Sequence, residues 1–338
     1  MKKILLLDPY PRTRELIFSK RDFKRLEEIF KIVEWEKGQM PSEMVDEFLP
    51  NTFAVIGQTD LPIERLKKAK ELKAIVNVEG NFQQNIDYNF CFKNGIHILN
   101  AGIAFSEAVA EIALGFALAL GRGISLTDRL FRSGEETYGR ASNKSSFLLK
   151  GKKAGIIGLG NVGKALLKLL DPFKLSIGVY DPWLPENFIL EMGCKALTLE
   201  ELLKTSRIIF LLAGATSENR AMIGDKELNL IKSDSLFILV SRAALVVFDS
   251  LTHHLKNKSF SAAIDVFPEE PLSKSSDLRS FDNVLLSSHR AGGIPEAYKL
   301  MGEMAADDLS LIAKGLAPVR LQKASLETVT RLTSRPVK

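Results

Sequence analysis

The chain has 338 residues, of which 46% are hydrophobic and 26% are charged, and its formal net charge is +5. This length is enough for two domains with separate cores, and the composition is that of an ordinary globular protein. The lysines and arginines are scattered along the chain rather than clustered, so we expect no nucleic-acid partner.

The first hundred residues alternate short apolar runs with helical patterns. The apolar run at the start is only four residues long and ends at Asp8-Pro9. It is therefore too short for the core of a signal peptide and predicts a buried strand over 3–7. The other elements expected here are strands at 54–57, 74–78 and 95–99 and a helix at 63–72. This alternation is typical of βαβ units and a parallel sheet.

A different pattern begins at Ala101. Residues 106–122 form a long apolar segment, with Ser106 as a candidate helix N-cap and with Glu107 and Glu111 in its first turns. The acids and the glycines of this segment favour a buried helix over a membrane span, so we expect no membrane contact. The following polar stretch, 125–150, predicts an arm or a long loop.

A second α/β series follows. Its predicted strands lie at 153–157, 176–180, 208–212, 236–240, 262–265 and 284–286, and a final helix is expected at 296–316. Six strands with intervening helices match a complete dinucleotide-binding domain. The tail from Gln322 onward is polar and is predicted to be disordered.

The two cysteines, Cys91 and Cys194, form no CxxC pair and have no metal-type spacing with histidine. We therefore expect no metal site. Reduced structural thiols are typical of a cytoplasmic protein.

The second series opens with a glycine-rich motif, Gly158-Leu159-Gly160-Asn161-Val162-Gly163, between an apolar strand and an apolar helix. Such a loop lets the backbone approach a pyrophosphate at the N-terminus of the helix. Asp181 ends the second strand, where an acid binds the ribose hydroxyls and repels the 2′-phosphate of NADP. No arginine follows it, so NAD is favoured over NADP. The alternative is a glycine turn in an unrelated α/β fold, with Asp181 an ordinary strand-end residue.

Three later clusters each supply one polar group: the guanidinium of Arg242, the carboxylate of Glu270 and the imidazole of His289. Together they are suited to binding a carbonyl or carboxylate and to moving a proton beside it. A proton-transfer set downstream of a hydride-carrier site predicts an oxidoreductase with a small-molecule substrate. The remaining histidines belong to no motif and are interpreted as surface or packing residues.

These motifs, in this order and spacing, resemble the D-isomer-specific 2-hydroxyacid dehydrogenase family over about residues 50–318. The resemblance implies two Rossmann-like α/β domains with parallel sheets. The substrate-binding domain would be split between 1–100 and 294–320, an NAD-binding domain would occupy 101–293, and a polar tail would occupy 321–338. It also implies a homodimer, with the long helix and the arm after it at the interface.

By the same resemblance, His289 would be the general acid/base, Glu270 would orient its imidazole, and Arg242 would bind the substrate carbonyl and carboxylate. Asp265 would hold the nicotinamide carboxamide and Val109 would pack on its ring. The implied cofactor contacts are Ser106, Val109, Gly158, Gly160, Asn161, Val162, Gly163, Asp181, Pro182, Ala213, Thr216, Val240, Ser241, Asp265 and Gly292. The implied substrate contacts are Gly80, Asn81, Phe82, Arg242 and His289.

The substrate loop departs from the family pattern. Phe82 stands where glycine is common and is expected to reshape the pocket, and Gln84 replaces an aspartate. Glu79 is an unusual neighbour for a substrate carboxylate unless it points away or binds a hydroxyl. Arg290 reaches an acidic substrate group or points to solvent. The leading hypothesis is a D-2-hydroxy acid dehydrogenase, with sugar acids or non-acid substrates as variants. The alternative is an NAD(H)-sensing binding protein on the same fold.

Overall fold

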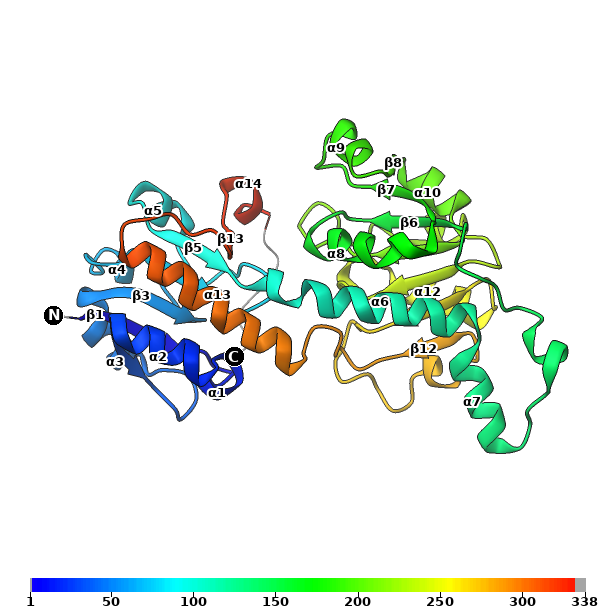
Figure 1. Cartoon of the computed structure of the whole chain (residues 1–338), viewed down its shortest axis with the longest axis horizontal. Coiled ribbons are helices and arrows are strands. Elements are labelled where there is room, and N and C mark those ends of the chain that lie inside the picture. The colour runs from blue at the N-terminus through cyan, green and yellow to red at the C-terminus, as the bar shows by residue number, and fades with distance from the viewer. Residues whose placement is uncertain (1, 332–338) are drawn as a thin grey trace. The chain divides into compact units, whose positions relative to one another are not determined.

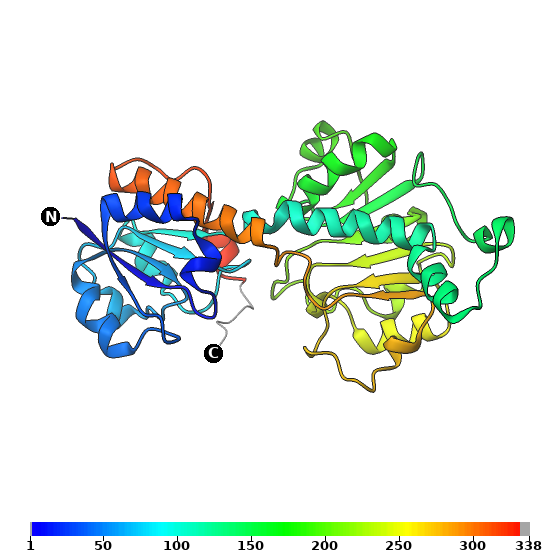
Figure 2. The same ribbon diagram turned by 60° about the horizontal axis from the view of Figure 1, so that its bottom comes forward.

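The computed structural model describes residues 2–331 and divides the chain into two compact units. Unit 1 combines residues 1–105 with residues from 293 onward, and unit 2 comprises residues 106–292. Each unit is an α/β sandwich with a largely parallel sheet between layers of helices (Figures 1 and 2). The divisions fall after Phe105 and Gly292, compared with residues 100 and 293 in the sequence-based division.

Unit 1 has a six-stranded sheet in the order β13-β5-β4-β3-β1-β2, in which β13 alone is antiparallel. Its elements are β1 (Lys3–Asp8), α1 (Arg14–Ile17), α2 (Lys20–Ile29), β2 (Phe30–Glu34), α3 (Ser42–Phe48), β3 (Thr52–Gly57), α4 (Ile63–Leu66), β4 (Ala74–Asn77), α5 (Tyr88–Lys93), β5 (His97–Asn100), α13 (Pro295–Ala313), β13 (Gln322–Lys323) and α14 (Leu326–Val329). The central strands β3 and β4 are buried along their whole length, as expected for parallel strands covered on both faces.

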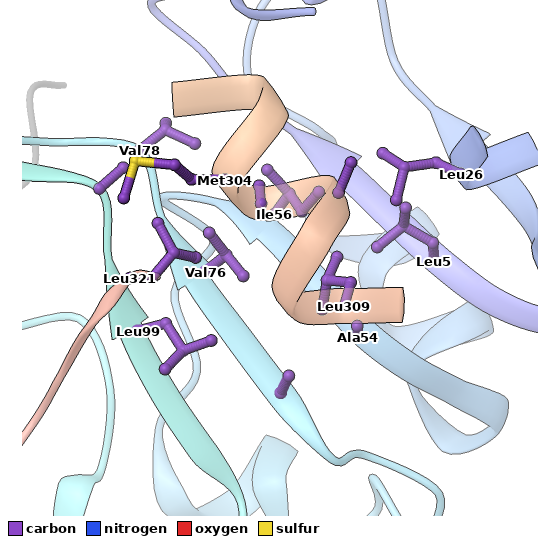
Figure 3. Packing of buried hydrophobic residues seen from close by; sticks show 14 of the residues in the cluster. Leu5, Leu26, Ala54, Ile56, Val76, Val78, Leu99, Met304, Leu309 and Leu321 are labelled. Carbon is purple, nitrogen blue, oxygen red and sulfur yellow. The ribbon is translucent and has the colours of Figure 1, made fainter. Parts of the chain in front are cut away.

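Helix α13 brings the end of the chain onto the sheet formed by its beginning. Met304 and Leu309 of α13 pack in one cluster with Leu5 of β1 and Val76 of β4 (Figure 3). Helices α1 and α2 belong to the same face, whereas α3, α4 and α5 contribute to the cluster on the opposite face. Both faces of the sheet are thereby removed from water, which is the main favourable contribution to folding.

The prediction of a disordered tail from Gln322 is wrong for residues 322–331. Strand β13 pairs with β5, and α14 follows it. The reason lies just upstream, where the fully buried Asp308 of α13 accepts hydrogen bonds from the backbone N–H groups of residues 319–321. Leu321 is then buried in the core, which directs the next residues along the sheet edge. Residues 332–338 of the predicted tail lie outside the described residues.

Unit 2 has a seven-stranded parallel sheet in the order β12-β11-β10-β9-β6-β7-β8. Its elements are α6 (Ser106–Gly121), α7 (Ile124–Ser133), β6 (Lys153–Ile157), α8 (Asn161–Leu170), β7 (Ser176–Tyr180), α9 (Glu186–Glu191), β8 (Lys195–Ala196), α10 (Leu199–Thr205), β9 (Ile208–Leu211), α11 (Asp225–Leu228), β10 (Leu236–Leu239), α12 (Phe248–Lys256), β11 (Ser261–Ile264) and β12 (Val284–Leu286). The strand order reverses between β6 and β9, so this sheet has its topological switch point there.

Helix α6 packs with α8 on one face of this sheet, and α10, α11 and α12 cover the other. A 3₁₀ turn, Gly102–Phe105, precedes α6, so Ser106 lies inside a continuous helical segment and is not its N-cap. The segment Gly102–Gly121 is long and apolar enough to cross a membrane by length and composition. The core helix of a soluble protein passes the same test. Seven residues of α6 are buried, including Ala113 and Phe116.

The predicted arm is in part helical. Residues Ile124–Ser133 form α7, which begins and ends at glycines in the left-handed conformation, Gly123 and Gly134. None of its residues is buried. The helix therefore has no apolar face packed on a core of unit 2, although its apolar side chains recur at helical spacing. Figure 1 shows α7 and the following segment extending away from the sheet of unit 2.

Candidate active site

The glycine loop after β6 has two crowded positions and one open position. Gly158 has φ +93°, and a Cβ there would lie 2.5 Å from the Cα of Ala213 in the loop after β9. Gly163 would place a Cβ 2.8 Å from the carbonyl oxygen of Gly158. At Gly160, by contrast, a Cβ would meet no described atom within 4 Å. The absence of a side chain at Gly158 and Gly163 thus allows the tight turn and the close packing of strand, turn and helix. The absence of one at Gly160 leaves the N-terminus of α8 accessible to a phosphate.

Asp181 follows β7 at the same edge of the sheet. Its carboxylate accepts hydrogen bonds from the N–H of Leu159, at 2.8 Å, and from the N–H of Trp183, at 3.0 Å. It lines a hollow of about 330 Å³ together with two further acids, Glu186 and Glu201. No lysine or arginine is among the described residues that line this hollow. Three carboxylates without a cation disfavour a phosphate at this place.

Asp265, directly after β11, is fully buried and anchors the segment that carries His289. Its carboxylate accepts the N–H groups of Arg290 and Ala291, both at 3.1 Å, and its carbonyl oxygen accepts the N–H of His289 at 2.7 Å. His289 has φ +51°, a left-handed conformation that is uncommon outside glycine. Because such conformations persist only where the surroundings hold them, the Asp265 bonds indicate a site built to aim one side chain.

The imidazole of His289 is held from one side. Its Nδ1 lies 2.6 Å from Oε2 of Glu270, whose Oε1 accepts the N–H of Phe267 at 2.9 Å. An ionised carboxylate only accepts hydrogen bonds, so this contact assigns the proton to Nδ1 and leaves Nε2 for another partner. Both side chains are open to solvent, with 47% of His289 and 37% of Glu270 exposed. The pair is thus oriented and accessible, as proton transfer to a ligand requires.

Arg242 follows β10 in the same unit. It is half-buried, and its Nη1 donates a hydrogen bond to the carbonyl oxygen of Ser241 at 2.7 Å. Burial lowers the pKa of Arg242, and the negative charge of Glu270 opposes that shift. A guanidinium removed from water in this way is stabilised by an anionic or carbonyl oxygen, which it binds with a planar fork of donors.

A concave pocket with a volume of about 910 Å³ adjoins His289 within unit 2. Its lining includes apolar residues of α6, such as Ile112 and Phe116, and the segment that carries Glu270. Arg290 also lines it, with its side chain exposed. A mainly apolar concavity with a few charged groups is the usual form of a small-molecule site.

The predicted substrate loop belongs to unit 1 and follows β4. The backbone of Glu79 is fixed twice, since its N–H donates to Oδ1 of Asn77 at 2.8 Å and its carbonyl accepts from Nδ2 of Asn100 at 2.9 Å. The ring of Phe82 is 5% exposed and packs edge-to-face on Tyr88. Its side chain therefore packs in the core of unit 1.

The structure brings most of the predicted cofactor residues to one edge of one sheet. The carboxyl ends of parallel strands meet at the same edge, and ligands bind there at the switch point. The predicted residues that follow these strands are Gly158, Gly160, Asn161, Val162 and Gly163 after β6, Asp181 and Pro182 after β7, Ala213 and Thr216 after β9, Val240 and Ser241 after β10, Asp265 after β11 and Gly292 after β12. Ser106 and Val109 lie on α6, and Gly80, Asn81 and Phe82 lie in unit 1.

Comparison with known proteins agrees with this arrangement. Residues 114–291 match the family model described as "D-isomer specific 2-hydroxyacid dehydrogenase, NAD binding domain". A glyoxylate reductase of Thermococcus litoralis is 33% identical over 93% of this chain and 95% of its own length. The chain belongs to the D-isomer-specific 2-hydroxyacid dehydrogenase family.

Two further relatives extend the comparison. A D-3-phosphoglycerate dehydrogenase of Methanocaldococcus jannaschii is 30% identical over 93% of this chain, which spans 58% of that longer protein. A crystal structure of a phosphoglycerate oxidoreductase from Rhizobium etli has a TM-score of 0.88 and 38% identity, and covers 97% of this chain and all of its own. The resemblance to the family and the two-domain α/β class predicted from the sequence are therefore confirmed, as is a nicotinamide-dependent oxidoreductase.

Sequence reasoning missed one charged residue of unit 1. Arg12 forms a bidentate ion pair with Glu79, in which Nη2 of Arg12 lies 3.1 Å from Oε2 of Glu79. Gln58 donates a hydrogen bond to the same carboxylate at 2.7 Å. Arg12 lies 67 residues before Glu79 and belongs to no motif, so no local signal in the sequence connects them.

Proposed function

We propose that this 2-hydroxyacid dehydrogenase transfers hydride between NAD(H) and the C2 atom of a D-2-hydroxy acid or its 2-oxo acid, with His289 as general acid/base. The observation that carries the proposal is the 2.6 Å contact between His289 and Glu270, on a segment that the buried Asp265 anchors. Unit 2 would then be the NAD-binding domain, and unit 1 the substrate-binding domain.

The residues of unit 2 suit a dinucleotide. The open Gly160 and the N-terminus of α8 would receive its pyrophosphate, and Asp181 its ribose hydroxyls. Asp265 would hold the nicotinamide carboxamide, and Val109 would pack against the ring. When bound, the nicotinamide supplies or accepts the hydride. The three acids that line the hollow beside Asp181 favour NAD over NADP, because a 2′-phosphate would face Asp181, Glu186 and Glu201.

The side chains of the catalytic set have separate tasks in reduction. Nε2 of His289 donates a proton to the carbonyl oxygen of the substrate as that oxygen gains charge. Glu270 keeps the imidazole in one orientation and stabilises its cationic form. Arg242 binds the carbonyl oxygen and the substrate carboxylate, so it stabilises the developing negative charge. Oxidation reverses these steps, with His289 taking the proton from the hydroxyl.

The substrate carboxylate would meet the backbone of the loop Gly80–Phe82. Two asparagines fix this loop through the backbone of Glu79, so its N–H groups are held in place before substrate binds. The side chain of Phe82 is buried, and residue 82 would therefore contribute only its backbone.

We further propose that the protein is a cytoplasmic homodimer. Two buried free thiols are typical of a reducing compartment. The segment after helix α6 exposes large apolar side chains, among them Phe131 at 61% and Tyr138 at 75%. An apolar surface of this kind is stabilised when a second copy covers it.

The decisive assay follows the absorbance of NADH with purified protein and a panel of 2-oxo acids, with NADPH in parallel. We expect turnover with at least one acid. In His289→Ala, turnover should fall by about 100-fold or more while the affinity for NADH is retained. Full activity of that variant would contradict the assigned role. NADH binding without turnover of any acid would favour an NAD(H)-sensing protein instead.

A further inference from the structure

The ion pair between Arg12 and Glu79 lies at the topological switch point of unit 1. Leaving β13 aside, the strand order is β5-β4-β3-β1-β2. Successive strands are therefore added on opposite sides of the boundary between β1 and β3. Arg12 lies in the loop after β1, Gln58 follows β3 directly, and Glu79 lies just after β4. In open α/β sheets this edge, beyond the carboxyl ends of the strands, is where ligands bind.

The cluster is polar and oriented, and it is largely but not completely buried. The side chain of Arg12 is 15% exposed and that of Glu79 is 18% exposed. The guanidinium of Arg12 also stands 5.5 Å from the ring centroid of Tyr298, which limits its freedom on the other side. Both charged groups are thus held in fixed positions while part of each faces outward.

The cluster also contains buried polar atoms that no described residue satisfies: Nε of Arg12, Oε1 of Gln58 and Nδ2 of Asn77. Gln58 is 3% exposed and Asn77 is fully buried. Native proteins leave few such atoms, and each requires a reason. A largely buried ion pair such as this one is weak evidence for stability, because the cost of removing both charges from water offsets their attraction. Binding of a polar ligand group at this edge would account for the cluster, whereas a contribution to stability would not.

We propose that Arg12 and Glu79 form a subsite for a hydroxyl group on the part of the substrate beyond C2, so that the enzyme prefers hydroxylated 2-oxo and 2-hydroxy acids. This inference rests on the proposed function. A hydroxyl both donates and accepts, and it matches a carboxylate beside a guanidinium. The pair has no net charge, and Glu79 would repel a second carboxylate or a phosphate. The next residue, Gly80, begins the loop assigned to the substrate carboxylate, which places the subsite beside the substrate.

The test compares acids that differ by one hydroxyl: pyruvate with hydroxypyruvate, and 2-oxobutyrate with 4-hydroxy-2-oxobutyrate. Hydrogen bonds to charged groups correspond to a preference of about 10- to 150-fold, and we expect kcat/KM to favour the hydroxylated acid by this factor in at least one pair. In Glu79→Gln that ratio should fall about tenfold or more. Gln58→Leu, which leaves both charges in place, should reduce the ratio by a smaller factor.

Asp46→Asn is the matched control, because Asp46 pairs with Arg65 in the same unit and not with Arg12 or Gln58. It should leave the ratio unchanged. NADH binding and the melting temperature show whether each variant is folded. An unchanged ratio in a folded Glu79→Gln, no preference in the wild type, or faster turnover of 3-phosphohydroxypyruvate than of hydroxypyruvate would each overturn the subsite and leave the proposed function intact. Failure to reduce any 2-oxo acid would overturn both.

Discussion

Substituting alanine for each of the three glycines of the cofactor loop should separate folding from cofactor binding. A methyl group at residue 160 meets no described atom within 4 Å, and the backbone there has φ −72° and ψ −159°, which any residue adopts. Gly160→Ala should therefore leave stability unchanged or raise it by about 0.4–1 kcal/mol. The same methyl group would occupy the approach of the pyrophosphate, so we expect NADH to bind about tenfold or more weakly, or about 1.4 kcal/mol.

Gly163→Ala is the matched comparison. Its Cβ would lie 2.8 Å from the carbonyl oxygen of Gly158, closer than real contacts allow, so helix α8 must shift away from the loop. Overpacking of this kind costs about 1–3 kcal/mol, or a melting temperature lower by roughly 2–12 °C for a unit of this size. Calorimetry gives the stabilities and fluorescence titration the affinities. Wild-type NADH affinity in Gly160→Ala, or an equal loss of stability in the two variants, would refute the reasoning.

Three other predictions address selectivity, stability and pH. Asp181→Ser should lower the preference for NADH over NADPH by about tenfold, measured as a ratio of kcat/KM values; an unchanged ratio would contradict the assignment of NAD. Asp308→Ala should destabilise the protein by about 3 kcal/mol in urea unfolding, because it leaves the N–H groups of residues 319–321 without their acceptor; a loss below about 1 kcal/mol would show that water replaces it. Burial acts to raise the pKa of Asp22, but hydrogen bonds from Ser19 and Arg21 outweigh it and the pKa is lowered. The resulting stability is present above the unfolded pKa of about 3.9 and is lost as pH falls through the folded value, so urea midpoints of Asp22→Asn should fall less steeply below about pH 4 than those of the wild type.

The strands of unit 2 were predictable because each is a short apolar run bounded by polar residues or glycine. Strands β6, β7 and β12 lie where the sequence placed them, and β9 and β10 end one residue earlier. A strand that is buried on both faces is a continuous apolar run, so it can be recognised from composition alone. The two-residue strand β8 offers no such run, and it was missed.

Elements whose stability depends on distant partners were harder to predict. Residues 20–34 received no assignment, yet they form α2 and β2, which are held by α13 and by β1 respectively. The candidate site divides in the same way. The glycine loop and the cluster around His289 have local motifs. The pairing of Arg12 with Glu79, by contrast, exists only because the sheet of unit 1 brings the two residues together. Tertiary pairing, rather than local preference, decides such positions.

The split construction of unit 1 has a consequence for synthesis on the ribosome. Leu5 packs in one cluster with Leu309, so the face of the sheet that carries Leu5 is only partly covered, by α1 and α2, until α13 has emerged (Figure 3). At roughly 5–20 residues per second, the ribosome needs roughly 10–40 s to extend the chain from β5 to the end of α13. Throughout this interval the nascent amino-terminal segment presents an apolar face and open strand edges, which are the features that chaperones bind and that aggregate when unprotected. Unit 2, whose sequence is continuous, has all of its strands once residue 292 has emerged, and so can fold before the segment that precedes it.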